Sequence, residues 1–77
     1  MLRPRRGLFY GGLMVKINGK DCDMDGKTVA EAIGMLGYDP RRVACELNEA
    51  IVPLGLFGDT VLKDGDSLEI VSFVGGG

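Results

Sequence analysis

Hydrophobic and polar residues alternate in several short stretches of the chain, which is the spacing of a half-buried β-strand. The first stretch, residues 15–17, ends at Asn18-Gly19, a pair typical of a type I′ hairpin turn because both positions need a positive φ. Residues 20–24 alternate again and place Cys22 and Met24 on the inward face. The pattern predicts a two-stranded hairpin at the start of the folded region.

A helical spacing follows the hairpin. Thr28 and Glu31 have the spacing of a capping box, in which each side chain bonds a free backbone N–H of the other's residue. Gly37 stands where a left-handed residue ends a helix, and Pro40 prevents continuation. The apolar residues between these signals lie three or four positions apart. They predict one buried stripe formed by Val29, Ala32, Ile33 and Leu36.

The second half of the chain returns to strand spacing. Residues 43–47 alternate with Cys45 inward, Asn48-Glu49 predicts a turn, and residues 50–53 predict an edge strand that ends at Pro53. Residues 54–62 are irregular, with a short helical turn expected near Phe57, and Arg41 and Arg42 are expected in a solvated loop.

The last strand is predicted over residues 68–74, after a turn at residues 63–66 that Asp64 and Asp66 shape. The alternation turns Leu68 and Ile70 toward the helix.

The order of these elements is two strands, a helix, two strands, an irregular segment and a strand. Because crossover connections are right-handed, the last strand is expected parallel to the first, in the middle of the sheet. This is an α+β, ubiquitin-like β-grasp fold, a mixed sheet of four to five strands packed on one helix. We expect the domain to span residues 14–74 and residues 75–77 to form a flexible glycine tail.

The first thirteen residues do not continue this pattern. They contain Arg3, Arg5 and Arg6, no acidic residue, and a proline and three glycines that interrupt any periodicity. Two interpretations stay open: a mobile, solvated N-terminal arm, or a non-native extension before a natural start at Met14.

Composition narrows the possible functions. The chain has 77 residues, enough for one small domain, and it contains no histidine, which excludes His-based catalysis and His-containing zinc sites. The spacing of Cys22 and Cys45 matches no metal motif, and no secretory or membrane segment is present, so free thiols in the cytoplasm are expected. Residues 14–77 carry a net charge of −5, which argues against nucleic acid and favours a partner with a basic surface.

The chain ends in Gly75-Gly76-Gly77, directly after the predicted central strand. A tail without Cβ atoms can enter a narrow slot and leaves its terminal carboxylate unhindered. That carboxylate is ionised at neutral pH and could attack the α-phosphate of ATP to form an acyl-adenylate, from which a sulfur nucleophile displaces AMP. The chain offers no base, metal ligand or phosphate loop of its own, so we expect a carrier rather than an enzyme, with no bound cofactor and no metal site.

Three segments resemble the ThiS family, the sulfur carriers of thiamin biosynthesis. They are the opening residues 15–19, the stretch of residues 43–53, and the ending of residues 64–77. Two departures stand out: Leu54-Gly55-Leu56 replaces the basic or polar residue common after the Val-Pro pair, and the Arg-rich arm is outside the family pattern. The resemblance covers residues 14–77, the whole predicted domain.

The resemblance implies specific partners and chemistry. An E1-like adenylyltransferase would adenylate Gly77 with ATP and Mg²⁺, Gly76 would precede the reacting residue, and a cysteine desulfurase or another sulfur donor would supply the sulfur. The resulting thiocarboxylate would donate sulfur to a thiazole synthase. Three alternatives remain: a sulfur carrier of molybdopterin synthase, a ubiquitin-like protein modifier, and a plain β-grasp interaction module.

Val71 and Phe73 are expected on the sheet face opposite the helix, where polar residues are usual. With Val74 and Gly75 they would form a docking patch for the activating enzyme beside the tail. The alternative is a second small cluster, filled by arm residues such as Leu8, Phe9 or Leu13. The two cysteines are interpreted as ordinary core residues, because buried apolar thiols are inert.

Overall fold

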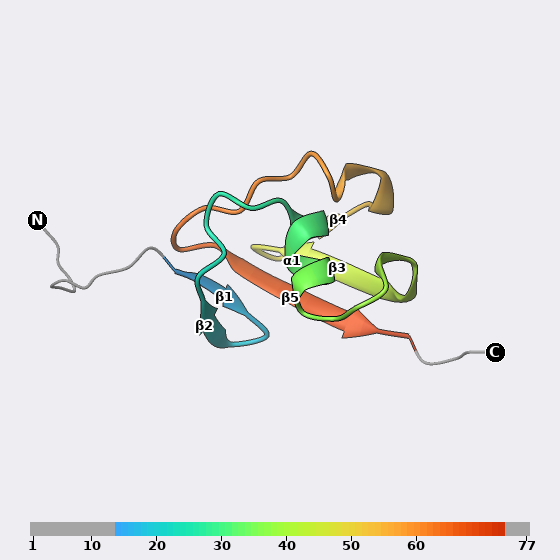
Figure 1. Cartoon of the computed structure of the whole chain (residues 1–77), viewed down its shortest axis with the longest axis horizontal. Helices are drawn as coiled ribbons and strands as arrows, with labels where there is room; N and C mark the ends of the chain where they lie inside the picture. Colours follow the sequence, from blue (N-terminus) through green and yellow to red (C-terminus); the bar gives the residue numbers. More distant parts are fainter. Residues whose placement is uncertain (1–13, 74–77) are drawn as a thin grey trace, which may run out of the picture.

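The computed structural model describes residues 14–73 (Figure 1). The predicted arm, residues 1–13, and the predicted tail with Val74 lie outside the described residues. Within the described part, the elements follow the order β1 (Val15–Ile17), β2 (Lys20–Cys22), α1 (Val29–Met35), β3 (Val43–Leu47), β4 (Ala50–Val52) and β5 (Ser67–Ser72), with short 3-10 helices at Pro40–Arg42 and Leu54–Leu56.

The strands form one mixed sheet in the order β2-β1-β5-β3-β4. Strand β5 pairs parallel with β1 and antiparallel with β3, and α1 lies diagonally across one face (Figure 1). The predicted β-grasp topology, with the last strand in the centre, is therefore confirmed. The last strand begins one residue earlier than predicted and ends at Ser72.

Two turns confirm their sequence signals. Asn18 and Gly19 have φ values of 52° and 84°, as a type I′ turn between β1 and β2 requires. Asn48 and Glu49, between β3 and β4, also have positive φ values, 51° and 72°. Both hairpins are therefore fixed in register by a two-residue connection.

The predicted capping box begins α1. Thr28 Oγ1 accepts the Glu31 N–H at 3.1 Å, and the Glu31 carboxylate accepts the Thr28 N–H at 2.8 Å. The prediction that Leu36 completes the buried stripe is wrong, since 41% of Leu36 is exposed. The helix ends at Met35, the chain reverses at Gly37 with φ of 86°, and Tyr38 packs against that end of the core instead.

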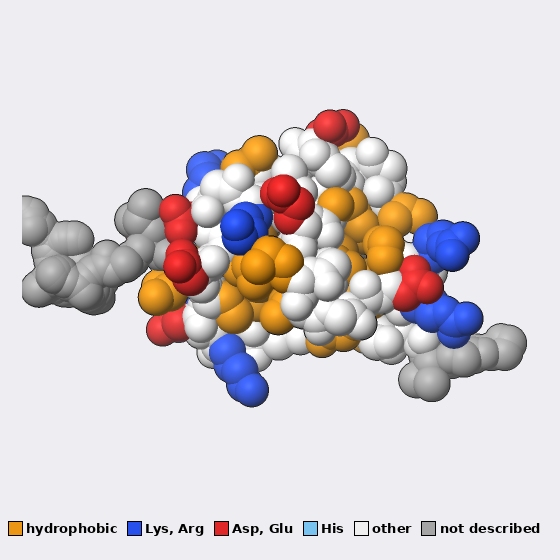
Figure 2. Space-filling model, viewed as in Figure 1, with side chains coloured by type: hydrophobic (Ala, Val, Ile, Leu, Met, Phe, Trp, Pro, Cys, Tyr) orange, Lys and Arg blue, Asp and Glu red, His pale blue; other side chains and the backbone are white. Residues whose placement is uncertain are grey.

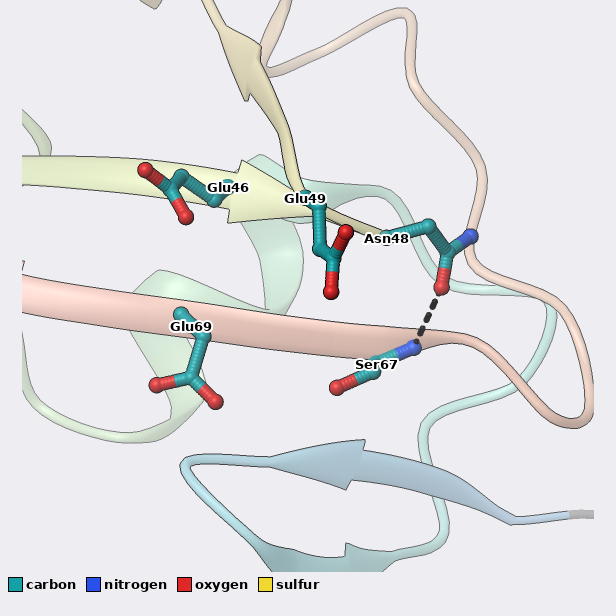
Figure 3. Close-up of a pocket in the computed structure, with 5 residues that line it drawn as sticks. All are labelled: Glu46, Asn48, Glu49, Ser67 and Glu69. Carbon is teal, nitrogen blue, oxygen red and sulfur yellow. Dashed lines mark hydrogen bonds between the residues drawn. The ribbon is translucent and has the colours of Figure 1, made fainter.

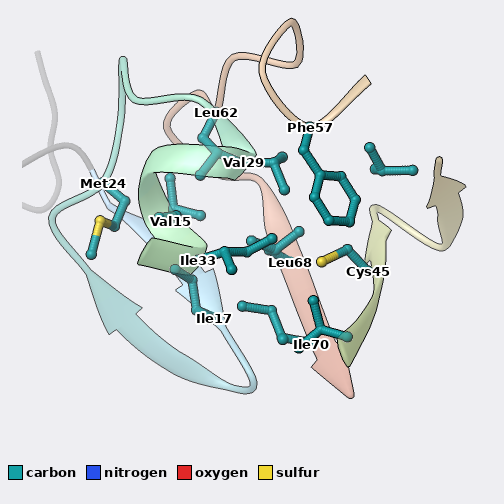
Figure 4. Close-up of a cluster of buried hydrophobic side chains, with 13 residues drawn as sticks. Val15, Ile17, Met24, Val29, Ile33, Cys45, Phe57, Leu62, Leu68 and Ile70 are labelled. Atoms are coloured by element: carbon teal, nitrogen blue, oxygen red, sulfur yellow. The ribbon is translucent and has the colours of Figure 1, made fainter. Parts of the chain in front are cut away.

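The core lies between α1 and the sheet (Figure 4). Its largest fully buried side chains come from β1, α1, β3, β5 and the irregular segment before β5: Val15, Val29, Ile33, Cys45, Leu68 and Leu62. Leu62 and Phe57, which is 3% exposed, come from the irregular segment and were not predicted as core. Backbone bonds of 2.8 Å from the Leu62 N–H to the Lys27 carbonyl and from the Gly26 N–H to the Leu62 carbonyl hold this segment over the start of α1.

The connection between α1 and β3 differs from the predicted loop. Pro40–Arg42 forms a short 3-10 helix because Asp39 caps it, accepting the Arg41 N–H at 2.9 Å, and proline suits its first position. Both arginines are exposed, as expected, and lie 3.9 and 3.7 Å from the Asp39 carboxylate.

On the face that carries α1, hydrophobic side chains gather in separate areas with charged side chains around them (Figure 2). None of the helices within residues 14–73 has the length and apolar character needed to cross a membrane.

Candidate functional site

Strand β5 is the base from which the C-terminal tail leaves the domain. Leu68 and Ile70, 0% and 5% exposed, anchor its inner face in the core, as predicted. One edge pairs with β3 from Val43 to Leu47, whereas β1 pairs with only the first two residues of β5. The tail therefore follows a central strand that is paired along both of its edges.

Two further hydrogen bonds hold β5 near its end. The Asn18 side chain in the hairpin turn accepts the Ile70 N–H at 2.7 Å, beyond the point where β1 pairing stops. The Phe73 N–H donates to the Arg42 carbonyl, also at 2.7 Å. These bonds fix the direction in which the backbone leaves the domain at Phe73.

Val71 lies where the alternation places it, on the sheet face that α1 does not cover, and Phe73 follows directly after the end of β5. They are 60% and 54% exposed, and Val71 stands directly opposite Ala44 of β3, which is also exposed. We call Val71 and Phe73 the docking pair. Its role in partner binding stays a prediction, and so do the roles of Gly76, Gly77, Gly75 and Val74, which lie outside the described residues.

The same face carries an acidic pocket, formed by the carboxylates of Glu46, Glu49 and Glu69 with Asn48 and Ser67 (Figure 3). Glu46 of β3 and Glu69 of β5 are direct cross-strand partners. The sequence analysis missed this pocket, although the outward phase of Glu46 and Glu69 in two adjacent strands was a signal for it.

Hydrogen bonds of Asn48 connect this pocket to the turn that contains Asp66. Asn48 accepts the Ser67 N–H at 2.9 Å (Figure 3) and donates to the Asp66 carboxylate at 3.0 Å. Asp66, only 8% exposed, also accepts the Lys63 N–H at 2.9 Å. The prediction that Asp66 shapes its turn is confirmed, and Asp64 contributes by accepting the Met14 N–H at 2.9 Å.

Both cysteines are free thiols. Cys45 is 1% exposed, and burial raises the pKa of its thiol, so it is a poor nucleophile at neutral pH. Cys22 is half-buried at the edge of the core. Within residues 14–73, no three side chains of the metal-binding types come together in a way that could hold a metal ion.

Comparison with known proteins gives a consistent match. The model of the ThiS family matches residues 15–77. The chain is 40% identical over 65 residues to the sulfur carrier protein ThiS of Thermus thermophilus, covering 83% of this chain and all of that protein. The crystal structure of a thiamine biosynthesis protein (ThiS) from Geobacter metallireducens superposes with a TM-score of 0.68 at 34% identity, covering 83% of this chain and 99% of that one.

The chain is also similar to part of a larger protein. It is 45% identical over 62 residues to a thiazole synthase of Paramagnetospirillum magneticum, covering 79% of this chain but only 19% of that protein. The chain thus spans about a fifth of the length of this relative.

Proposed function

The chain belongs to the ThiS family of sulfur carriers in thiamin biosynthesis, and on that premise we propose that its own C-terminal carboxylate is the sulfur-carrying group. The observation that carries the proposal is the match of the family model up to Gly77, together with a central strand that leads directly toward the terminal glycines. In this proposal partner enzymes bind the folded domain, and the reacting atoms belong to the C-terminal tail.

The chemistry proceeds in two steps. A carboxylate oxygen of Gly77 attacks the α-phosphate of ATP, pyrophosphate leaves, and the product is an acyl-adenylate. A sulfide-level nucleophile then attacks the acyl carbon and AMP leaves, so that the carboxylate becomes a thiocarboxylate. When the sulfur arrives as a persulfide, the first product is an acyl disulfide, and a thiol reductant cleaves its S–S bond, releases the thiocarboxylate and is itself oxidised to a disulfide. The activating enzyme, an E1-like adenylyltransferase, supplies ATP, Mg²⁺ and the catalytic groups, and a cysteine desulfurase or another donor supplies the sulfur.

The docking pair is the surface we propose for the activating enzyme. Val71 and Phe73 are apolar, more than half exposed, and four and two residues before Gly75, the first tail residue, so an enzyme that binds them also receives the tail. Val74 and Gly75 would lie in the same contact, between the docking pair and the reacting Gly77.

The sulfur acceptor in this proposal is a thiazole synthase. The proposal is supported by a thiazole synthase that contains a segment 45% identical to this chain, since a carrier and the enzyme that consumes its sulfur must come together. We place these reactions in the cytoplasm, where the two free thiols of the domain would stay reduced.

The test is an intact-mass measurement after incubation with an E1-like adenylating enzyme, ATP, Mg²⁺, and a cysteine desulfurase supplied with cysteine and a thiol reductant. We expect a mass gain equal to sulfur replacing oxygen. Deleting Gly77 should abolish this gain without changing the circular dichroism spectrum or melting temperature, because residue 77 follows the folded domain. A gain that survives the deletion would refute the proposal.

A matched control separates tail chemistry from thiol chemistry. A persulfide on the half-buried Cys22 would add a whole sulfur atom, so its mass differs from that of a thiocarboxylate. Cys22→Ser should leave the expected gain unchanged. Attachment of the chain to lysines of other proteins, with no thiocarboxylate, would instead identify a ubiquitin-like modifier.

A further inference from the structure

Strand β1 ends before β5 does, so the second half of β5 has no backbone neighbour from β1. The pairing with β1 covers only the first two residues of β5, which continues to Ser72. On this side the backbone ladder reaches the bond from the Asn18 N–H to the Leu68 carbonyl, at 2.9 Å. Because a strand presents alternate residues to one neighbour, the next donor on this edge is the N–H of Ile70.

The side chain of Asn18 supplies the acceptor for this donor. Asn18 is the first residue of the turn between β1 and β2, with φ of 52°, and the chain reverses there. Its side-chain Oδ1, in place of a backbone carbonyl, accepts the Ile70 N–H at 2.7 Å. One side-chain amide thus extends the parallel ladder by one step beyond β1.

The turn itself does not require this side chain. A type I′ turn accepts glycine as well as asparagine at its first central position. Ile70, however, is 5% exposed, so without Asn18 its N–H would be a buried donor without a partner. Asn18 therefore has a second role that the geometry of the turn does not explain.

An equivalent bond holds the beginning of β5. Asn48 opens the turn between β3 and β4 with φ of 51°, and its side-chain oxygen accepts the Ser67 N–H at 2.9 Å. The two hairpins on either side of β5 thus each contribute one asparagine at a positive φ. Of the two, Asn18 is the one beside the docking pair, because Ile70 directly precedes Val71, whereas Ser67 lies four residues before it.

Loss of the Asn18 bond should loosen the end of β5 in particular. The other edge of β5 stays paired with β3 up to Ser72, which lies opposite Val43. With the first edge released, residues 70–73 could move relative to the open sheet face, the face that α1 does not cover. An enzyme that binds the docking pair would then have to order this segment, at a cost in affinity.

We propose that Asn18 is a positioning residue for the carrier reaction. Its side chain acts through the Ile70 N–H and fixes the end of β5, and with it the docking pair, in one orientation for the activating enzyme. This inference rests on the proposed function, in which the activating enzyme binds the docking pair.

The test compares Asn18→Gly with Asn48→Gly in the full chain. Both variants replace an exposed turn asparagine at a positive φ by glycine, so their effects on turn geometry and chain entropy are matched. Asn48→Gly also removes the bond from its amide to Asp66 at 3.0 Å, so the control loses more contacts of the fold. Pyrophosphate release by the E1-like adenylyltransferase, measured against carrier concentration, gives KM and kcat for each variant.

The expected result is an increase in KM for one variant only. Asn18→Gly should raise KM about fivefold, the factor for ordering roughly one backbone residue, and leave kcat within about twofold of the wild type. Asn18→Asp tolerates the positive φ and keeps a side-chain oxygen, so it should restore the wild-type KM. An unchanged KM in Asn18→Gly, equal increases in both glycine variants, or no rescue by Asn18→Asp would each overturn the proposal.

Amide hydrogen exchange gives a readout that needs no enzyme. The Ile70 amide should exchange about tenfold faster in Asn18→Gly than in the wild type, with the Ser67 amide unchanged, and Asn48→Gly should show the reverse. Unchanged exchange at Ile70 in Asn18→Gly would overturn the anchoring itself. A wild-type chain that gains no sulfur in the mass assay would instead refute the proposed function, and the exchange rates would still decide whether Asn18 holds the end of β5.

Discussion

At the residue scale, replacing the exposed aromatic side chain at the end of β5 should change partner binding without changing the stability of the fold. Phe73 is 54% exposed, and its contribution to the fold is a backbone N–H that any residue but proline supplies. We expect Phe73→Ala to weaken binding to the activating enzyme by about tenfold or more, as for an aromatic anchor at an interface. The melting temperature should stay nearly unchanged, because exposed substitutions change stability by about 0.5 kcal/mol or less.

Leu54 provides the matched control for this prediction. It is also 54% exposed but lies in the 3-10 helix after β4, away from the end of β5. Titrations of both alanine variants with the activating enzyme should show a loss for Phe73→Ala only. A large loss of stability in Phe73→Ala with intact binding would place this side chain in the core instead.

The buried thiol of Cys45 makes stability depend on alkaline pH. Burial raises the pKa of this thiol in the folded state, so its contribution to stability is fully present below the ordinary thiol pKa of about 8.5. As the pH rises further, the unfolded thiol ionises while the folded one stays neutral, and the contribution is lost as the pH rises through the folded pKa. Urea unfolding at neutral and alkaline pH should show a smaller alkaline loss for Cys45→Ala than for the wild type.

The other thiol serves as the control for this pH dependence. Cys22→Ala retains Cys45 and should therefore keep the alkaline loss of the wild type. Equal alkaline losses in all three proteins would show that Cys45 does not contribute to this dependence.

At the element scale, the seven-residue helix α1 depends on its start. A helix this short is marginal by itself, so its capping box and its packed stripe must hold it. We expect Thr28→Ala to reduce the free energy of unfolding by about 1 kcal/mol, because a backbone N–H loses its partner. Glu31→Gln should have a much smaller effect in the same urea titration, because glutamine also completes a capping box.

Most elements of the fold were predictable from local signals. The positive-φ pair Asn18-Gly19, the capping box at Thr28 and the outward phase of Val71 each depend on neighbouring residues alone, and each prediction was confirmed. Leu62 was missed because it lies in a segment without periodicity. Its burial depends on backbone bonds to Gly26 and Lys27, far away in the sequence.

In the candidate site, too, features that depend on neighbouring residues were predictable, and features that depend on contacts between distant segments were not. The exposure of the docking pair follows from alternation in a single strand, so the sequence was sufficient. The acidic pocket depends on the register that places Glu46 opposite Glu69, and on a hairpin that brings in Glu49. Pairing register between strands separated in sequence is a property of the folded sheet, which explains why the pocket was found only in the structure.

At the scale of the whole molecule, the tail must have the right length to bring the Gly77 carboxylate to the catalytic centre of an enzyme that binds the domain. Inserting one glycine between Val74 and Gly75 lengthens the tail by about 3.5 Å and leaves the three terminal glycines intact. We expect this variant to bind the activating enzyme normally and to gain sulfur much more slowly in the mass assay. Unchanged sulfur gain would mean that tail composition matters and tail length does not.

The two hydrogen bonds that hold β5, from Ile70 to Asn18 and from Phe73 to Arg42, make the end of this strand a fixed origin. Four residues follow Phe73, and at 3.3–3.6 Å each they carry the last residue no farther than about 14 Å from it. The molecule therefore sets a maximum distance between its folded domain and its reacting carboxylate. Any enzyme that grips the open sheet face and reacts with the terminal carboxylate must have its catalytic centre within that radius, which sets a geometric limit on every partner of this carrier.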